Sequence, residues 1–172
     1  MKTIKDLLGE HHFFEGLDAS AIETIAGCGT NVVFKRGDLI AREGQPADYF
    51  YVIRKGRVAI DIAAPAHGQI TIQTLAANDV LGFSWIVSPH QWRFDCQAVL
   101  ESHAVKLDGK CLRGKCDADC VLGYALLNRF SAVLAQRLEM TRLQLLDIYG
   151  EQPAASGVVG AELTRMDESK WQ

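Results

Sequence analysis

The residues best suited to chemistry lie between positions 78 and 100, in the segment NDVLGFSWIVSPHQWRFDCQAVL. Its pattern predicts a turn, a short helix and a strand, with one arginine, Arg93, near the end. The other large side chains of the segment are aromatic: Phe83, Trp85, Trp92 and Phe94. A helix start offers unpaired N–H donors, and a guanidinium is a forked, always-charged partner for phosphate oxygens. These residue types raise the question whether the segment binds a phosphorylated small molecule or only shares the fold of proteins that do.

More ordinary roles are open to the same residues. Arg93 can form an ion pair with Asp95 or Glu101, as a surface arginine commonly does. Trp85 and Trp92 are more simply explained as core side chains that cover the mouth of a pocket than as a surface on which a base stacks. Under this alternative, the aromatic rings close the pocket without a ligand.

No other group of side chains predicts catalysis or metal binding. The run CLRGKCDADC holds Cys111, Cys116 and Cys120, but it has no CxxC pair and no nearby histidine. The histidines lack the His-x-His spacing of a metal cupin, the other β-barrel fold considered. A Ser/His/Asp elbow, paired catalytic carboxylates and a GxxxxGK phosphate loop are missing as well. We therefore expect a non-enzymatic protein with no metal and no cofactor.

Length and composition indicate a single binding unit. The 172 residues are 48% hydrophobic, which is enough to bury one core. A formal charge of −3 and scattered basic residues argue against DNA as a direct partner. The amino end lacks the apolar core of a signal peptide, and no run of about 18 apolar residues is present to span a bilayer. We expect a cytoplasmic protein, without membrane contact, whose five cysteines are mostly thiols.

Short helices, then strands, then a long helix are expected along the chain. Two helical patterns precede Gly29, and either Asp18 or Ser20 can cap the second. Between Val32 and Leu107 the apolar residues come in short β-rich runs separated by glycines. The expected fold is mainly β with flanking helices. It is a β roll of double-stranded jelly-roll type with N-terminal helices, a short helix within the 78–100 segment and a long C-terminal helix.

The C-terminal helix carries a long apolar stripe. Asp117 or Asp119 can cap a helix that begins near Cys120. The stripe repeats at spacings of three and four: Leu127, Phe130, Leu134, Leu138, Thr141, Leu145 and Ile148. Because a small β roll cannot cover so long a helix, we expect part of the stripe to pair with a second copy in a homodimer. Residues 1–149 then form one domain, and the Gly-, Ala- and Ser-rich residues 150–172 form a flexible tail.

Taken together, these elements resemble the cyclic nucleotide-binding domain, the sensor of the catabolite-activator family and of protein kinase A regulatory subunits. The resemblance is most specific in FKRGDLIAREGQPADYFYVIRKGRVAI, residues 34–60. There, glycines stand at the turns between strands, where a positive φ is needed: Gly37, Gly44 and Gly56. The resemblance covers roughly residues 10–149.

The resemblance also implies which residues hold a ligand. In the family, a cyclic phosphate lies at the start of a short helix, held by free amide groups and by an arginine about ten residues later. Gly82 matches the glycine that opens the helix, and Arg93 follows eleven positions on. Residues 82–94 are thus the counterpart of the family's phosphate-binding cassette, here named the cassette segment, with cAMP or cGMP as the candidate ligand.

Several positions depart from the family pattern. Phe83 stands where a glutamate accepts a ribose hydroxyl, and Phe94 stands where a serine or threonine contacts the phosphate. Asp95 replaces a small alanine and places a negative charge nearby. Since an unpaired polar group costs about 1 to 3 kcal/mol, cAMP affinity is expected to be below the family norm or absent. Ser84 can replace a lost hydroxyl contact, and Thr141 aligns with the helix position that reaches the base.

The leading hypothesis is a stand-alone regulatory sensor. A ligand at the cassette segment would shift the long helix and change the surface shown to an unidentified protein partner. The alternative is a degenerate domain that binds nothing and works as a dimerising interaction module. A third and weaker hypothesis is a thiol redox sensor built on Cys111, Cys116 and Cys120. Only 23 residues follow Tyr149, too few for the helix-turn-helix domain of the family's transcription factors, so direct DNA binding is not expected.

Overall fold

The structure, a computed structural model, describes residues 2–64 and 68–150, with side chains described up to residue 147. The chain divides into two compact units, Met1–Ser131 and the residues from Ala132 onward. The first unit holds the strands and most of the helices, and the second holds the later part of the long helix. The flexible tail expected for residues 150–172 lies outside the described residues except for residue 150, so the boundary near 149 stays a prediction.

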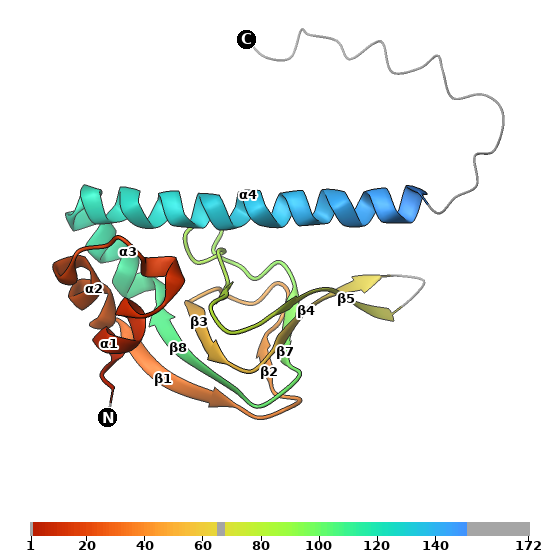
Figure 1. Cartoon of the computed structure of the whole chain (residues 1–172), viewed down its shortest axis with the longest axis horizontal. Coiled ribbons are helices and arrows are strands. Elements are labelled where there is room, and N and C mark those ends of the chain that lie inside the picture. Colours follow the sequence, from red (N-terminus) through yellow and green to blue (C-terminus); the bar gives the residue numbers. More distant parts are fainter. Residues whose placement is uncertain (1, 65–67, 151–172) are drawn as a thin grey trace, which may run out of the picture. The chain divides into compact units, whose positions relative to one another are not determined.

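Two antiparallel four-stranded sheets form a β roll, which confirms the expected fold (Figure 1). The first sheet has the order β1 (Gly29–Phe34), β8 (Ser102–Asp108), β3 (Tyr49–Lys55) and β6 (Val80–Leu81). The second has the order β2 (Leu39–Ala41), β7 (Asp95–Ala98), β4 (Val58–Ala64) and β5 (Gly68–Leu75). The three turn glycines of residues 34–60 all have positive φ, as the resemblance implies. The glycine pattern therefore marks the turns of the roll.

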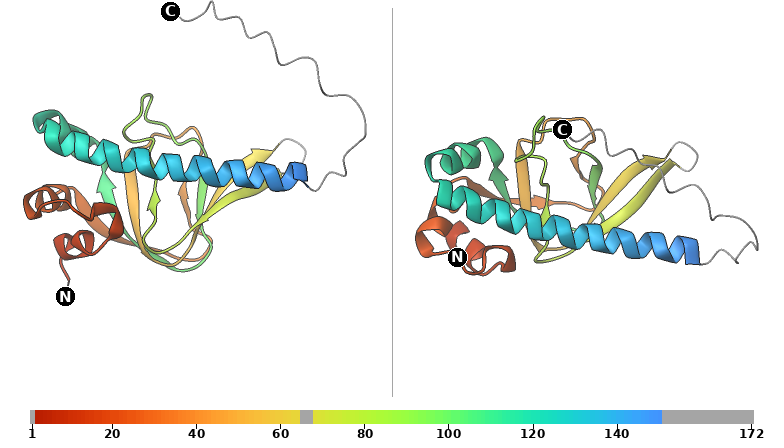
Figure 2. Two further views of the ribbon diagram at one scale, coloured as in Figure 1. Left: turned by 45° about the horizontal axis from the view of Figure 1, so that its top comes forward. Right: turned by 90° about the horizontal axis from the view of Figure 1, so that it is seen from above.

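Helices precede and follow the strands, as the sequence predicts. They are α1 (Ile4–Gly9), a 3-10 turn (His12–Phe14), α2 (Ala19–Ala26), α3 (Gly109–Ala118) and α4 (Cys120–Gly150). In Figure 1 and in both views of Figure 2, α1, α2 and α3 gather at one end of the roll, and the β4–β5 hairpin extends at the other. None of the helices in residues 2–64 and 68–150 is long and apolar enough to cross a membrane.

Aspartates begin three of the helices. Asp18, rather than Ser20, caps α2 by accepting a hydrogen bond of 2.8 Å from a backbone N–H of its first turn. Asp119, rather than Asp117, caps α4 by accepting two such bonds, at 3.0 and 3.1 Å. Asp108 caps α3 with a bond of 2.7 Å. This cap is the sequence signal for α3, which was not expected as a separate helix.

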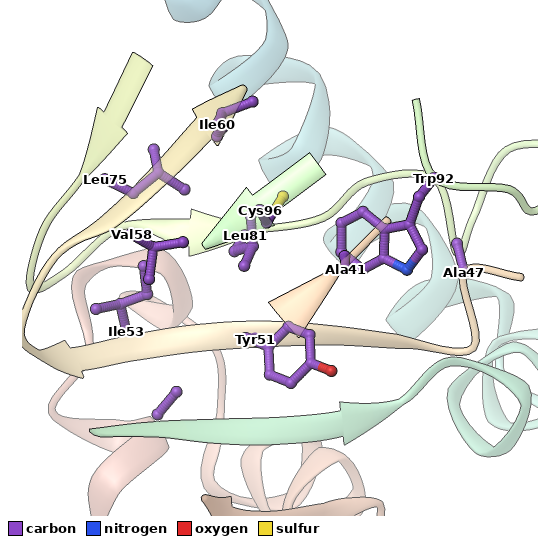
Figure 3. Packing of buried hydrophobic residues seen from close by; sticks show 11 residues of the cluster. Ala41, Ala47, Tyr51, Ile53, Val58, Ile60, Leu75, Leu81, Trp92 and Cys96 are labelled. Atoms are coloured by element: carbon purple, nitrogen blue, oxygen red, sulfur yellow. The ribbon is translucent and has the colours of Figure 1, made fainter. Parts of the chain in front are cut away.

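The interior of the roll is filled by apolar side chains. Its cluster comprises Ala41, Ala47, Tyr51, Ile53, Val58, Ile60, Leu75, Leu81, Trp92, Cys96 and Ala104. Figure 3 shows Trp92 and Tyr51 within this interior. A second group of aromatic rings joins the roll to the first part of α4. There Trp85 stacks on Phe50, with ring centroids 4.9 Å apart, and meets the edge of Phe130 at 5.6 Å.

The short helix expected in the cassette segment is a pair of turns instead. Ile86 donates its N–H to the carbonyl of Phe83 at 3.1 Å, and His90 donates to that of Val87 at 2.9 Å. No helix is assigned anywhere in residues 82–94, all of which the structure describes. Pro89 contributes to the difference, since it has no N–H to donate and disfavours the helical conformation at residue 88, where a helix from Gly82 would have to continue.

One pair of cysteines departs from the expectation of free thiols. Cys28, which follows α2, forms a disulfide with Cys111 in the first turn of α3. The two positions are separated by 83 residues, so their spacing gave no signal of the bond. Cys116 and Cys120 are free thiols, as expected. The described residues contain no cluster of three or more side chains suited to hold a metal ion.

Candidate functional site

The cassette segment begins at Gly82, directly after β6. The backbone φ of Gly82 is +94°, a conformation that side chains disfavour. A Cβ at this position would lie 2.7 Å from the Trp92 ring. Gly82 is therefore required by its backbone and by the close approach of Trp92, which lies ten residues later in the same segment.

The turn after Gly82 is anchored in the core by Trp85. The Trp85 side chain is fully buried between Phe50 and Phe130. Its backbone carbonyl accepts a hydrogen bond from the Arg113 guanidinium on α3. Burial of Trp85 and Trp92 confirms their interpretation as core side chains. The contact of Arg113 was not found from the sequence, because nothing in the pattern of α3 links it to a residue 28 positions earlier.

Arg93 lies exposed near the end of the segment, and no hydrogen bond or ion pair to it occurs within the described residues. The two ion pairs considered for it are not formed. Asp95 instead accepts a hydrogen bond of 2.8 Å from the Glu43 N–H and another of 2.7 Å from the Gln69 side chain. Glu101 lies 3.2 Å from the ring of His103. The guanidinium of Arg93 is thus available to an anion.

Phe83 and Phe94 face each other across the segment. Their ring centroids are 6.0 Å apart with the planes inclined by 60°, and both side chains are half-buried. Phenylalanine has neither a carboxylate to accept a hydrogen bond from a sugar hydroxyl nor a hydroxyl to contact a phosphate. The departures expected from the sequence are thus brought together at one place.

Three buried polar atoms of the segment have no hydrogen-bond partner within the described residues. They are Ser84 Oγ, Trp85 Nε1 and His90 Nδ1. Ser84 is only 3% exposed, so its hydroxyl is removed from solvent as well. Buried polar atoms are nearly always bonded, because leaving one unpaired costs about 1 to 3 kcal/mol. Of the three, Ser84 Oγ lies nearest to Gly82 in the chain, two residues after it.

Thr141 is not placed relative to these residues. It belongs to the second compact unit, where its hydroxyl donates to the Arg137 carbonyl at 2.9 Å. Of the predicted site residues, the structure brings Phe83 and Phe94 into ring contact. The ligand-binding roles of Gly82, Ser84, Arg93 and Thr141 stay predictions.

Burial raises the pKa of one side chain in the roll and of one in α3. Removal from water raises the pKa of Tyr51, in the roll interior, to about 12, so its phenol is neutral at ordinary pH. Burial also raises the pKa of the Cys116 thiol, and the charges of Asp117 and Asp119 add to the shift. Cys116 is thus a poor thiolate, which weighs against a reactive role for it.

Comparisons with known proteins identify the family to which these residues belong. The family profile described as "Cyclic nucleotide-binding domain" matches residues 31–119. A curated relative is the "CRP-like cAMP-activated global transcriptional regulator" of Mycobacterium tuberculosis (strain CDC 1551 / Oshkosh), which is 29% identical over 143 residues. The match covers 83% of this chain and 62% of the relative, so the chain spans less than two thirds of that protein's length.

Solved structures show the same fold. A putative cyclic nucleotide-binding protein from Geobacter metallireducens GS-15 superposes with a TM-score of 0.71 at 22% identity, covering 80% of this chain and 99% of that one. A cyclic nucleotide-binding domain from Methylobacillus flagellatus KT superposes with a TM-score of 0.73 at 19% identity, covering 93% of this chain and 85% of that one. At these identities, the structural likeness concerns the fold alone.

Proposed function

We propose that this chain, which belongs to the cyclic nucleotide-binding domain family, senses a cyclic nucleotide of the cAMP type or a related anionic ligand through its cassette segment. Domains of this family are regulatory and non-enzymatic. The name of the Mycobacterium tuberculosis relative, a cAMP-activated regulator, supports cAMP as the first ligand to test. The chain spans only 62% of that relative. A protein partner and a cytoplasmic location for this chain are therefore part of the proposal.

The observation that carries this proposal is the buried, unpartnered hydroxyl of Ser84 two residues after Gly82. An anion seated there would accept hydrogen bonds from this hydroxyl and from the guanidinium of Arg93, which has no ion pair among the described residues. Ligand binding would then satisfy a group that the free domain leaves unpaired.

The same segment supports weak rather than tight cAMP binding. Phe83 and Phe94 supply no acceptor for the ribose and no hydroxyl for the phosphate. The carboxylate of Asp95 is engaged by Glu43 N–H and Gln69, which lessens its repulsion of an anion without removing its charge. A ligand that lacks ribose hydroxyls would lose less binding free energy at this site than cAMP does, because it has no hydroxyl to leave unpaired.

We also propose that the domain forms a homodimer through α4. Within the second unit, the apolar stripe has exposed leucines at spacings of four and seven: Leu134, Leu138 and Leu145, which are 37%, 64% and 48% exposed. Rows of apolar side chains with this period usually pair with another helix. A second copy of the chain offers a matching stripe.

Calorimetric titration with cAMP and with cGMP tests the ligand proposal. Saturable binding is expected, and Arg93→Ala is expected to weaken it about ten- to a hundredfold, the value of one charged hydrogen bond. Arg36→Ala is the matched control, because Arg36 is an exposed arginine in the turn between β1 and β2. No heat at millimolar ligand would refute nucleotide sensing and favour the dimerising interaction module, and equal losses for the two variants would refute the role of Arg93.

A further inference from the structure

The helix α3 is tied to two separate parts of the domain by side chains. On one side, the Cys28–Cys111 disulfide and a hydrogen bond of 2.5 Å from Lys115 Nζ to the Thr24 carbonyl join it to the end of α2. On the other side, the Arg113 guanidinium binds the carbonyl of Trp85 in the cassette segment. α3 therefore lies between a covalent restraint and the candidate ligand site.

The contact with the cassette segment is close as well as hydrogen bonded. A Cβ at Gly109, the first residue of α3, would lie 2.9 Å from the Trp85 Cβ and 3.0 Å from the Asp48 carbonyl. Gly109 also donates its N–H to that carbonyl at 2.7 Å. Since packing here leaves no slack, a displacement of the first turn of α3 must displace Trp85 and its neighbour Ser84.

The disulfide holds that same first turn. Cys111 is the third residue of α3, and its partner Cys28 stands between α2 and β1. Cys28 is buried, whereas Cys111 is partly exposed, so a reagent can reach the bond from the side of Cys111. In a reducing compartment such as the proposed cytoplasm, persistent disulfides are rare, and those that form are usually transient and catalytic or redox-sensing.

We propose that the Cys28–Cys111 disulfide is a redox-controlled restraint on the cassette segment. Reduction by a dithiol of the thioredoxin type loosens the first turn of α3, and Arg113 transmits this to the turn at Trp85. This inference rests on the proposed function for its effect on ligand affinity and for the reducing compartment. Its conformational part concerns the domain without ligand.

The chemistry is ordinary thiol–disulfide exchange. A thiolate of the dithiol attacks Cys111 Sγ, the S–S bond breaks, and Cys28 leaves as a thiolate that takes up a proton. The second thiol of the reductant then loses its proton and attacks the mixed disulfide, which releases Cys111. The domain gains two electrons and two protons, and the dithiol becomes a disulfide.

Reduction is expected to loosen α3 locally and not to release it. The Asp108 N–H still donates to the Cys28 carbonyl at 3.0 Å, and Lys115 still binds Thr24. Arg113 is thus a positioning residue, whose effect on the cassette segment depends on how firmly α3 is held.

Amide hydrogen exchange of the ligand-free chain tests the proposal. Free thiols are alkylated at purification, and the mass of the linked peptides first establishes whether the Cys28–Cys111 disulfide is present. Reduction with dithiothreitol is expected to speed exchange about tenfold in residues 109–113 and 84–87. The double variant Cys28→Ser with Cys111→Ser should reproduce this without reductant. Cys116→Ser, a cysteine of the same helix outside the bond, is the matched control and should change neither segment.

Arg113→Met removes the hydrogen bond to the Trp85 carbonyl and leaves the Cys28–Cys111 disulfide in place. In the oxidised protein it should speed exchange in residues 84–87 while residues 109–113 stay protected, and Arg113→Lys should restore part of the protection. Absence of the Cys28–Cys111 peptide, or equal exchange of residues 84–87 before and after reduction, would overturn the inference. If neither redox form binds a cyclic nucleotide, the proposed function fails, while the exchange result still decides the redox restraint.

Discussion

Gly82 is held to glycine by two separate constraints, a positive φ and the nearby ring of Trp92. Gly82→Ala is expected to lower the free energy of unfolding by about 2 to 5 kcal/mol, the sum of backbone strain and overpacking. Gly37 is the matched control, since its φ is +93° but nothing lies within 4 Å of its Cβ position. Gly37→Ala should lose only about 1 to 2 kcal/mol. Urea unfolding measures both, and equal losses would contradict the contact with Trp92.

Two buried serines differ in their partners and should respond in opposite ways. Ser84 Oγ has no partner within the described residues, so Ser84→Ala should leave the melting temperature unchanged or raise it while weakening anion binding. Ser102 Oγ accepts from the Arg57 N–H at 3.1 Å and donates to the Leu100 carbonyl at 2.8 Å. Ser102→Ala should therefore destabilise the domain by about 1 to 3 kcal/mol. A comparable loss for Ser84→Ala would mean that its hydroxyl is already satisfied.

Among the elements, the later part of α4 is the one expected to pair with a second copy of the chain. Leu138→Lys places a charge in the exposed apolar stripe and should weaken the proposed homodimer about tenfold or more. Gln136→Lys adds the same charge beside the stripe and serves as its control. Light scattering over a range of concentrations measures the mass of each variant. A monomer at every concentration for the unchanged chain would contradict pairing through α4.

The elements also differ in how far the sequence could predict them. The roll was predictable because its turns need glycine, and Gly37, Gly44 and Gly56 stand at those turns. The helix expected in the cassette segment is not formed. The family pattern predicted it, but Pro89 favours a turn at its own position. For α2, two good caps lay two residues apart, and only the bond to Asp18 decides between them.

At the scale of the whole molecule, contacts between distant residues escaped the sequence. Cys28 and Cys111 are 83 positions apart, and Arg113 meets Trp85 through a backbone carbonyl, which every residue has. Spacing along the chain carries no information on either contact. The ligand-binding role of Gly82 to Arg93 stays a prediction from the sequence, whereas the hydrogen bond that this segment receives from α3 became visible only in the folded chain.

If an anionic ligand occupies the cassette segment, as proposed, the amide NMR signals of that segment must shift when the isotope-labelled chain is titrated with cAMP. Saturable shifts are expected at Gly82, Ser84 and the Nε–H of Arg93. The cAMP concentration at which the Gly82 and Ser84 shifts reach half their final size should rise about ten- to a hundredfold in Arg93→Ala. Signals that stay unmoved at millimolar cAMP, or that move only outside residues 82–94, would contradict it.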